Sequence, residues 1–437
     1  MSSEPASLAR RYGLATAVAI IVGQVIAVGI FLVPAGMARS VGSPAWLLAI
    51  WVIIGLMTLC GAFCYAELSA RFPEAGGTYV YLREAYGDMV AFLFGWIVLL
   101  VLDPGLTAIF SLGLTSYLDR IFPIPIPYQP FVAAIVVVVV ALMNIFGARL
   151  GSKVIESLTL AKVTFLLLIV LIGVLSGKGD SANLSPFFAA PSDIVGAMAG
   201  GLVGAFFAFA GWWELTRIAG EIRDPERNLP RALIIGVLIL TLIYISVSGV
   251  FMYLVPTAGI TSDETFAAQV GEVLFGSVGA TVFSIVVIAS VLGSLIAYMM
   301  VSPRLYYAMA RDGLFFRSVA AVHPRFGTPY VAIAIQAILA LILIFSGSFQ
   351  QIISLFFFVV VLFIAATVAS IFVFRRRSGH DGFKAPGYPL TPLVFLLITA
   401  VVLFFIGMRD PIRTLIGIGL VFLGLPVYYL FRTRREN

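Results

Sequence analysis

The sequence is poor in charged residues. Asp, Glu, Lys and Arg make up 11% of its 437 residues, whereas 61% belong to the hydrophobic set. A soluble domain carries roughly 25% charged and 45–50% apolar residues, so this shortage of charge excludes a soluble globular protein and intrinsic disorder. A nucleic-acid binder is excluded as well, because the net charge of +6 comes from arginines scattered over predicted loops and forms no basic face.

Cysteine and histidine are also scarce, which limits the chemistry of the chain. Cys60 and Cys64 are the only cysteines, and a spacing of four on a helix strains a disulfide and makes an incomplete metal site. We interpret them as small buried apolar residues. His323 and His380 fall in predicted loops without the partners that nucleophilic or metal chemistry needs. We therefore expect no catalytic residue, no metal and no cofactor, so that the chain is not an enzyme.

Long apolar runs are what the sequence has in abundance. A membrane-spanning helix needs about 20 mostly apolar residues, and runs of this kind, bounded by charges or by Pro and Gly, recur along the whole chain. They predict an all-α integral membrane protein in which residues 1–437 form a single transmembrane domain. Twelve spans are expected, approximately at 14–38, 44–70, 88–118, 131–148, 154–175, 194–219, 231–256, 275–302, 330–346, 350–374, 390–407 and 412–431.

Lys and Arg are distributed unevenly among the predicted loops. Positive residues concentrate on cytoplasmic loops. With the N-terminus inside, 21 of the 27 Lys and Arg residues lie on the cytoplasmic side, 5 lie outside, and Lys162 falls within a span. Both termini are therefore predicted to be cytoplasmic. We expect a retained first span and no cleaved signal peptide, because its apolar run of about 25 residues exceeds the short apolar region of a signal.

Two spans carry clusters of glycine, around the stretch IAVGIF in the first and FAFAGW in the sixth. The residues are Gly23, Gly29 and Gly36 with Pro34, and Gly196, Gly200, Gly201, Gly204 and Gly211. Interrupted spans at matching positions of two halves indicate a transporter site in an inverted repeat. The repeats would cover about 14–175 and 194–374, with extra helices 11 and 12 at about 390–431. Close helix packing through small residues explains the same glycines equally well.

Several segments resemble a known family in their order and spacing. They are VGQVIAVGIFLVPAGMA in the first span, YAELSARFPEAGGTYVYLREAYG after the second, FFAFAGWWELTRIAGEIRDPERNLPRA through the sixth, and SPRLYYAMARDGLF with VHPRFGTPY after the eighth. The chain resembles the amino acid–polyamine–organocation (APC) superfamily of permeases, in particular its bacterial L-type amino acid transporter (LAT)-like members. The resemblance covers nearly the whole chain. It implies 12 transmembrane helices in a LeuT-like fold, a 5+5 inverted repeat with helices 1 and 6 broken.

The resemblance also implies where a substrate binds. In the family, backbone N–H groups of the first break hold the substrate carboxylate, and carbonyls of both breaks receive its α-ammonium. The corresponding N–H groups here belong to Ala27, Val28 and Gly29, and the carbonyls lie near Gly23, Phe207, Ala208 and Ala210, with Gly211 in the same break. The residues alone favour this arrangement, because a broken helix presents unpaired N–H groups to an anion and unpaired carbonyls to a cation.

This chain departs from the family at the first break. The common pattern there is glycine, a small or hydroxyl residue, and glycine, whereas Ala27 and Val28 precede Gly29 here. The added methyl groups crowd the carboxylate position and a hydroxyl donor is lost, which leaves the identity of the amino acid open. Phe207 aligns with an aromatic gate over the substrate in the family, although an aromatic residue packed in the core would give the same sequence pattern. Trp213 stands where many members have a small amide.

Ionisable groups inside a span cost at least about 2.5–3.5 kcal/mol to insert, so each is a functional candidate. Lys162 matches the lysine that replaces a sodium ion in sodium-independent members, and the resemblance implies a coupling contact with the first break and with Ser294. Asp103, in the third span, has no family role. A hydrogen bond to a neighbouring span and a proton relay are both open for it. Glu214 and Arg217 are predicted to pair on one helical face, apart from the substrate site.

We predict a sodium-independent secondary active transporter of L-amino acids, proton-coupled or an exchanger, that works by alternating access in a bacterial inner membrane. Its partners would be a small-molecule amino acid and the lipid membrane. The loop DRIFPIPIPYQP lacks the cysteine by which animal heterodimeric relatives bind a heavy chain, so we expect no disulfide-linked heavy-chain partner. Two alternatives remain: a polyamine or other organic-cation transporter, which needs carboxylates at the site, and an amino-acid-binding membrane sensor, which needs an output domain that we do not expect after Phe431.

Overall fold

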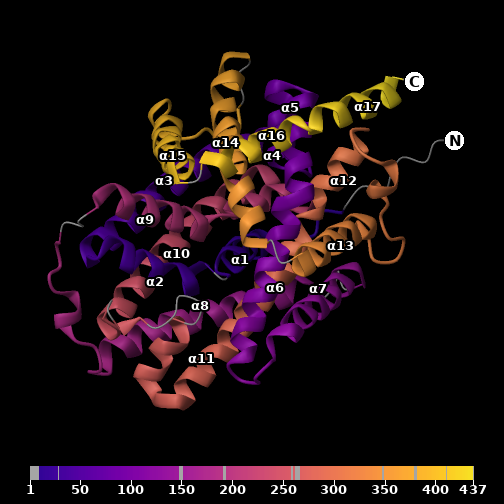
Figure 1. Cartoon of the computed structure of the whole chain (residues 1–437). Coiled ribbons are helices and arrows are strands. Elements are labelled where there is room, and N and C mark those ends of the chain that lie inside the picture. The colour runs from indigo at the N-terminus through magenta and orange to yellow at the C-terminus, as the bar shows by residue number, and fades with distance from the viewer. Residues whose placement is uncertain are drawn as a thin grey trace.

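The computed structural model describes residues 9–27, 29–146, 151–189, 193–256, 259–260, 266–346, 349–377, 381–409 and 411–436. Within these ranges the extended regular elements are all helices (Figure 1). The first half contains α1 (Leu14–Val25), α2 (Gly29–Val41), α3 (Pro44–Arg71), α4 (Thr78–Tyr86), α5 (Asp88–Ile97), η1 (Val98–Leu102), α6 (Asp103–Asp119), η2 (Ile126–Tyr128), α7 (Gln129–Phe146), α8 (Gly151–Leu175) and η3 (Ser181–Leu184). The second half contains α9 (Ile194–Phe209), η4 (Trp212–Glu221), α10 (Pro225–Leu254), α11 (Phe266–Val301), α12 (Pro303–Arg311), η6 (Arg317–Ala320), α13 (Tyr330–Ser346), α14 (Phe349–Arg377), α15 (Leu390–Arg409), α16 (Pro411–Phe422) and α17 (Gly424–Glu436).

Ten helical segments of the described residues are long and apolar enough to cross a membrane. The first and ninth predicted spans contain shorter apolar helices instead, Leu14–Val25 and Tyr330–Ser346. The first is short because α1 stops after 12 residues and the chain continues as a separate helix, α2. The all-helical class expected from the sequence is thus confirmed, whereas the number of twelve spans and the inverted repeat stay predictions.

The outer helices expose large apolar side chains. On α8, Leu160 is 69% and Leu175 is 72% exposed, and on α16 Ile412 and Leu415 are 70% and 69% exposed. Exposed apolar patches of this extent mark a surface that contacts something other than water. α8, and α16 together with most of α17, form segments long enough to span a bilayer, so we interpret these faces as the surface that contacts lipid.

The helices nearest the centre of the bundle are apolar on all sides. α1 lies in the middle (Figure 1), packs against α8, α10 and α11, and has most of its residues buried. A helix that is apolar all round belongs in the core of a large protein or membrane bundle. α2 packs mainly against α9, so the two helices that follow and precede the predicted breaks are neighbours.

The third predicted span changes its helical form halfway along. Residues Val98–Leu102 form a single π-helical turn between α5 and α6, directly before Asp103. Such turns widen the helix and are frequent at functional sites. This widening places the Asp103 carboxylate, which is fully buried, at the start of α6.

The start of the described chain is bound to the end of η4. The N–H groups of Arg11 and Tyr12 donate to Glu221 O over 2.7 and 3.0 Å, and Arg304 Nε lies 2.8 Å from Glu221 Oε1. Burial, reinforced by the Glu221 carboxylate, raises the pKa of Tyr12 to about 12. We call this arrangement the terminal clamp; its members are Arg11, Tyr12, Glu221 and Arg304.

Candidate functional site

The first predicted interruption separates α1 from α2. α1 ends at Val25, and Ile26 leaves the helical conformation with φ −73° and ψ 70°. The N–H of Ala27 donates to Val25 O over 2.8 Å, which closes a tight turn. Because α2 begins at Gly29, its first N–H groups have no partner within the helix. Val28, which the resemblance assigned to the carboxylate, lies outside the described residues.

The second interruption ends α9 at Phe209. Ala210 is extended, with φ −54° and ψ 142°, and Gly211 adopts a φ of +104°. A side chain would be strained at such a positive φ, so glycine permits the chain to turn here. The N–H of Glu214 closes the turn by donating to Gly211 O over 3.0 Å. The chain then continues as the tight helix η4, so the sixth predicted span is broken near its middle.

The two interruptions face each other. A Cβ atom added to Gly29 would lie 3.0 Å from the Cα atom and 3.3 Å from the Cβ atom of Ala208, so the backbone of α2 runs directly against α9. The hydroxyl of Tyr244 in α10 lies 3.0 Å from both Val25 O and Ala208 O. This hydroxyl ties the end of α1 to the end of α9, and the predicted binding residues of both breaks are therefore neighbours.

A residue that the sequence analysis missed points at the second interruption. Gln24 is 3% exposed, and neither atom of its amide has a hydrogen-bond partner among the described residues. Its Nε2 atom lies 3.9 Å from the place that a Cβ atom on Gly211 would take. A buried polar group without a partner costs about 1–3 kcal/mol, so we expect a group from outside the chain to bind this amide. In the sequence, a lone Gln in an apolar span is indistinguishable from a packing residue.

Lys162 of α8 binds the first interruption. Its Nζ atom lies 2.8 Å from Gly23 O, 3.0 Å from Ile26 O, 2.9 Å from Ser290 O and 2.9 Å from Ser294 Oγ. The last carbonyls of a helix lack intrahelical donors and carry its negative dipole end. The ammonium satisfies these carbonyls and opposes that dipole. These are contacts that the resemblance implied, whereas the coupling role of Lys162 and Ser294 stays a prediction.

Gly23 belongs to this lysine site. Its carbonyl accepts hydrogen bonds from Lys162 Nζ and, over 2.7 Å, from Ser294 Oγ. Two donors engage both lone pairs of the oxygen. A Cβ atom on Gly23 would also collide with the side chain of Thr159 in α8. The resemblance implied that the Gly23 carbonyl receives the substrate ammonium, but in the structure this carbonyl accepts from two side chains of the protein.

Asp103 lies at the centre of a buried polar cluster. Its Oδ2 atom is 2.7 Å from Arg217 Nη1 and 2.5 Å from the hydroxyl of Tyr306, and its Oδ1 atom is 2.6 Å from the hydroxyl of Tyr298. Arg217 also pairs with Glu214, with Nε 2.5 Å from Oε2 and Nη2 2.9 Å from Oε1. We call these five residues the buried cluster. Of the two interpretations of Asp103, hydrogen bonding to neighbouring helices is confirmed and the relay role stays a prediction.

A small cavity lies beside the second interruption. Its volume is about 30 Å³, which holds about one or two water molecules. It is lined by Val101, Leu102, Leu106, Phe207, Ala210, Gly211, Trp213, Glu214, Phe357, Val360 and Val361. The prediction that Glu214 lies apart from the site is therefore wrong, because its side chain lines the same cavity as Phe207. The ring centroid of Phe207 lies 5.9 Å from that of Phe357, and its role as a gate stays a prediction.

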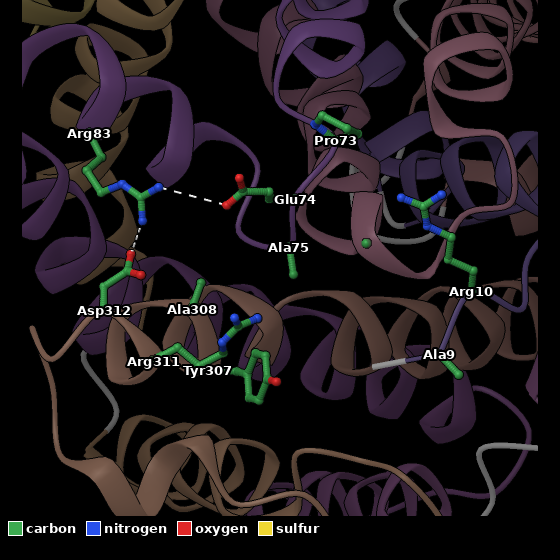
Figure 2. A pocket seen from close by; sticks show the side chains of 11 residues that line it. Ala9, Arg10, Pro73, Glu74, Ala75, Arg83, Tyr307, Ala308, Arg311 and Asp312 are labelled. Atoms are coloured by element: carbon green, nitrogen blue, oxygen red, sulfur yellow. Dashed lines mark hydrogen bonds and ion pairs between the residues drawn. The ribbon is translucent and has the colours of Figure 1, made fainter. Parts of the chain in front are cut away.

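A larger pocket opens among the loops, away from both interruptions. It has a volume of about 590 Å³ and is lined by Ala9, Arg10, Pro73, Glu74, Ala75, Arg83, Gly220, Tyr307, Ala308, Arg311 and Asp312. Figure 2 shows Arg83 directed at Asp312 and Glu74, with Arg10 across the opening. Burial lowers the pKa of Arg83, but the Asp312 carboxylate outweighs it and raises that pKa above its usual range. Gly220, near the end of η4, lines this pocket, but the residues at the two interruptions do not.

The thiols and the potential metal ligands add no further site. Cys60 and Cys64 are both buried free thiols. In the part of the chain that the structure describes, no three His, Cys, Asp or Glu side chains are grouped so that they could hold a metal ion.

Comparisons with known proteins bear on this geometry. A family model described as "Amino acid permease" matches residues 12–423. The "Serine/threonine exchanger SteT" of Bacillus subtilis (strain 168) is 29% identical over 442 aligned positions, which cover 100% of both chains. The human "Large neutral amino acids transporter small subunit 2" is 30% identical over 97% of this chain and 81% of its own. The human "Cystine/glutamate transporter" is 29% identical over 98% of this chain and 86% of its own.

Proposed function

Because the chain belongs to the amino acid permease family, whose members are transporters and not enzymes, we propose that it moves an L-amino acid across a bacterial inner membrane by alternating access. The observation that carries this proposal is the contact between two interrupted helices, with Gly29 against Ala208. The unpartnered amide of Gln24 lies beside Gly211 of the second interruption. Peptide groups freed at two such interruptions can hold both poles of a zwitterion.

The carboxylate of the substrate binds at the start of α2. The first N–H groups of α2, from Gly29 onward, lie at the positive end of a helix dipole, which suits an anion, whereas the N–H of Ala27 already donates to Val25 O. The α-ammonium binds carbonyls near Phe207, Ala208 and Ala210, because the carbonyl of Gly23 already has two donors. These backbone contacts are common to all α-amino acids. The side chains around the cavity then select among them.

Transport is sodium-independent in this proposal. The Lys162 ammonium contacts four oxygens, from α1, from Ile26 just beyond its end and from α11. This is an oxygen-rich environment in which a sodium ion would otherwise bind. An ammonium there takes the place of a sodium ion, which supports proton-coupled transport or exchange instead of sodium symport. Lys162 and Ser294 would couple the conformation of the first interruption to the side of the membrane toward which the carrier is open. Asp103 would contribute to the same coupling through the buried cluster.

The proposed architecture is that of twelve spans in a LeuT-like inverted repeat, with both termini cytoplasmic. The terminal clamp supports the arrangement of the ends, because it joins Arg11 and Tyr12 to the end of η4. The aromatic ring of Phe431 in α17 packs on Phe315 and Phe316, shortly after α12, so both described ends lie near α12. This shared location is what an even number of spans requires. We expect no disulfide-linked heavy-chain partner.

Alternating access requires one side of the bundle to close while the other opens. The buried cluster joins α6, η4, α11 and α12, and the terminal clamp joins η4 and α12 to the start of the chain. Both groups of contacts therefore hold closed the end of the bundle that contains the chain ends. In the proposed cycle, these contacts separate when the carrier opens toward the cytoplasm.

Counterflow in proteoliposomes tests the proposal. Proteoliposomes that contain the purified full chain are loaded with each of twenty unlabelled L-amino acids in turn. Uptake of labelled substrate is then measured with and without sodium and with and without a pH gradient. We expect uptake of at least one amino acid, unaffected by sodium. Saturable binding without uptake would support the membrane sensor, uptake of polyamines alone would support the organic-cation transporter, and either result would refute the proposal.

A further inference from the structure

The cavity beside the second interruption combines apolar walls with one charge. Three predicted spans supply its apolar walls. The residues are Val101, Leu102 and Leu106 of the third span, Phe207 of the sixth span, and Phe357, Val360 and Val361 of the tenth span. Among the lining residues, Glu214 alone is charged. Such a pocket suits a substrate side chain with an apolar stem and a charged head.

The charges around Glu214 do not balance within the protein. The buried cluster holds two carboxylates, Asp103 and Glu214, but a single guanidinium, Arg217, and all three side chains are 0–2% exposed. The remaining members of the cluster are the neutral hydroxyls of Tyr298 and Tyr306, and the groups that contact it from outside, the Trp213 indole N–H and the Ser302 carbonyl, carry no charge. The cluster therefore has a formal excess of one negative charge, away from water. Buried charges are normally paired, because desolvation of an unpaired charge is costly.

The positive charge of Lys162 does not offset this excess. Its ammonium is bound to four oxygens of α1 and α11, and these contacts oppose the dipole of α1. On the tenth predicted span, the residues that face Glu214 across the cavity are Phe357, Val360 and Val361, which carry no charge. These described residues therefore supply no compensating cation, so that a cation or a proton from outside has to balance the charge.

The geometry of Glu214 indicates where that cation would lie. Its Oε1 atom accepts hydrogen bonds from Trp213 Nε1 over 2.8 Å and from Arg217 Nη2 over 2.9 Å. Its Oε2 atom lies 2.5 Å from Arg217 Nε, yet it accepts no hydrogen bond from the described residues. Trp213, which occupies the position of a small amide in many members of the family, thus orients a carboxylate whose second oxygen is ion-paired with Arg217 and can still accept a further hydrogen bond.

We propose that the transported amino acid has a positively charged side chain, such as that of lysine or ornithine, whose head group binds the Glu214 carboxylate. This inference rests on the proposed function and specifies the substrate class. The apolar stem would contact Leu102, Leu106 and Val360, while the aromatic faces of Phe207 and Phe357 favour a nearby cation. The present cavity of about 30 Å³ holds no more than the head group, so substrate entry has to separate Phe207 from Phe357.

A lysine and norleucine pair isolates the effect of the charge. L-norleucine has the aliphatic stem of lysine without the ammonium, so the ratio of their counterflow rates reports the charge alone. We expect wild-type proteoliposomes to take up L-lysine at least ten times faster than L-norleucine. Glu214→Gln should lower this ratio at least tenfold, because it slows lysine uptake far more than norleucine uptake, and Glu214→Asp should restore part of the ratio. Glu272→Gln, at an exposed position of α11, is the matched control and should leave the ratio unchanged.

Each outcome separates this inference from the proposed function. Uptake of neutral amino acids without lysine uptake would refute the inference and leave the proposed function intact, whereas uptake of no amino acid would refute both. A neutral substrate driven by a pH gradient, with that dependence lost in Glu214→Gln, would show that a proton supplies the missing charge and would refute the inference. Should Glu214→Gln fail to fold, thermal stabilisation of the wild type by lysine but not by norleucine decides the question, and equal stabilisation refutes it.

Discussion

Replacing Lys162 by methionine removes the ammonium and keeps an unbranched side chain in α8. Four oxygens lie within 3.0 Å of Nζ, and an ammonium donates three hydrogen bonds. In the variant, the Ser294 hydroxyl still lies 2.7 Å from Gly23 O and 3.0 Å from Ile26 O, but its single proton can serve only one of them, and Ser290 Oγ lies 3.3 Å from Ile26 O. The carbonyl at the first interruption therefore loses its strongest donor.

The size of the effect follows from these contacts. A hydrogen bond from a charged group contributes about 1.5–3 kcal/mol, and a cation at a helix C-terminus adds about 0.3–1 kcal/mol. Together they favour the present shape of the interruption by about 2–4 kcal/mol, which corresponds to about 30- to 1000-fold in a conformational equilibrium. The variant is also relieved of the cost of burying an ammonium. We therefore expect a large loss of transport with little change in the stability of the fold.

Counterflow rate and melting temperature distinguish these two effects. Lys162→Met should reduce the rate at least about 30-fold, as the equilibrium above requires, while its melting temperature stays within a few degrees of the wild type. Lys178→Met is the control, because Lys178 is exposed and its ammonium binds Leu274 O in a contact remote from the interruptions. A Lys162→Met rate within threefold of the wild type would show that the lysine does not shape the interruption for transport.

Three further variants test the site. Gly29→Ala places a methyl group 3.0 Å from the Cα atom of Ala208, so counterflow should fall at least tenfold, whereas Gly419→Ala, with no atom within 4 Å of the added methyl group, should match the wild type. Gln24→Met removes an amide that lacks a partner among the described residues, so the melting temperature of the substrate-free protein should stay the same or rise. Substrate affinity, measured by thermal shift, should fall about tenfold, and an unchanged affinity would contradict a contact between this amide and the substrate. Arg217→Met leaves two buried carboxylates without their cation. The free energy of unfolding, measured by chemical denaturation in detergent, should fall by about 3–5 kcal/mol. A fall of less than about 1 kcal/mol would show that the carboxylates are neutral.

The sequence by itself determined the helical class and the places where two helices break. Apolar runs of membrane-spanning length identify helices, since each helix satisfies its own backbone hydrogen bonds in lipid. The breaks at Gly29 and Gly211 could be located because backbone conformation depends on nearby residues, and a φ of +104° at Gly211 requires glycine. Both features are local, and local features can be read from a single chain.

The tertiary structure decided which side chains meet. Asp103 and Arg217 pair across 114 positions of the sequence. Glu214 pairs with Arg217 as their spacing predicted, but it also lines a cavity, although we expected the pair to lie apart from the site. That the Gln24 amide lacks a hydrogen-bond partner among the described residues can be recognised only when its neighbours in other helices are known. The physical reason is that such contacts depend on how far each helix is rotated and displaced against the others. Helical periodicity fixes the faces of one helix, but it does not fix which neighbouring helix each face will contact.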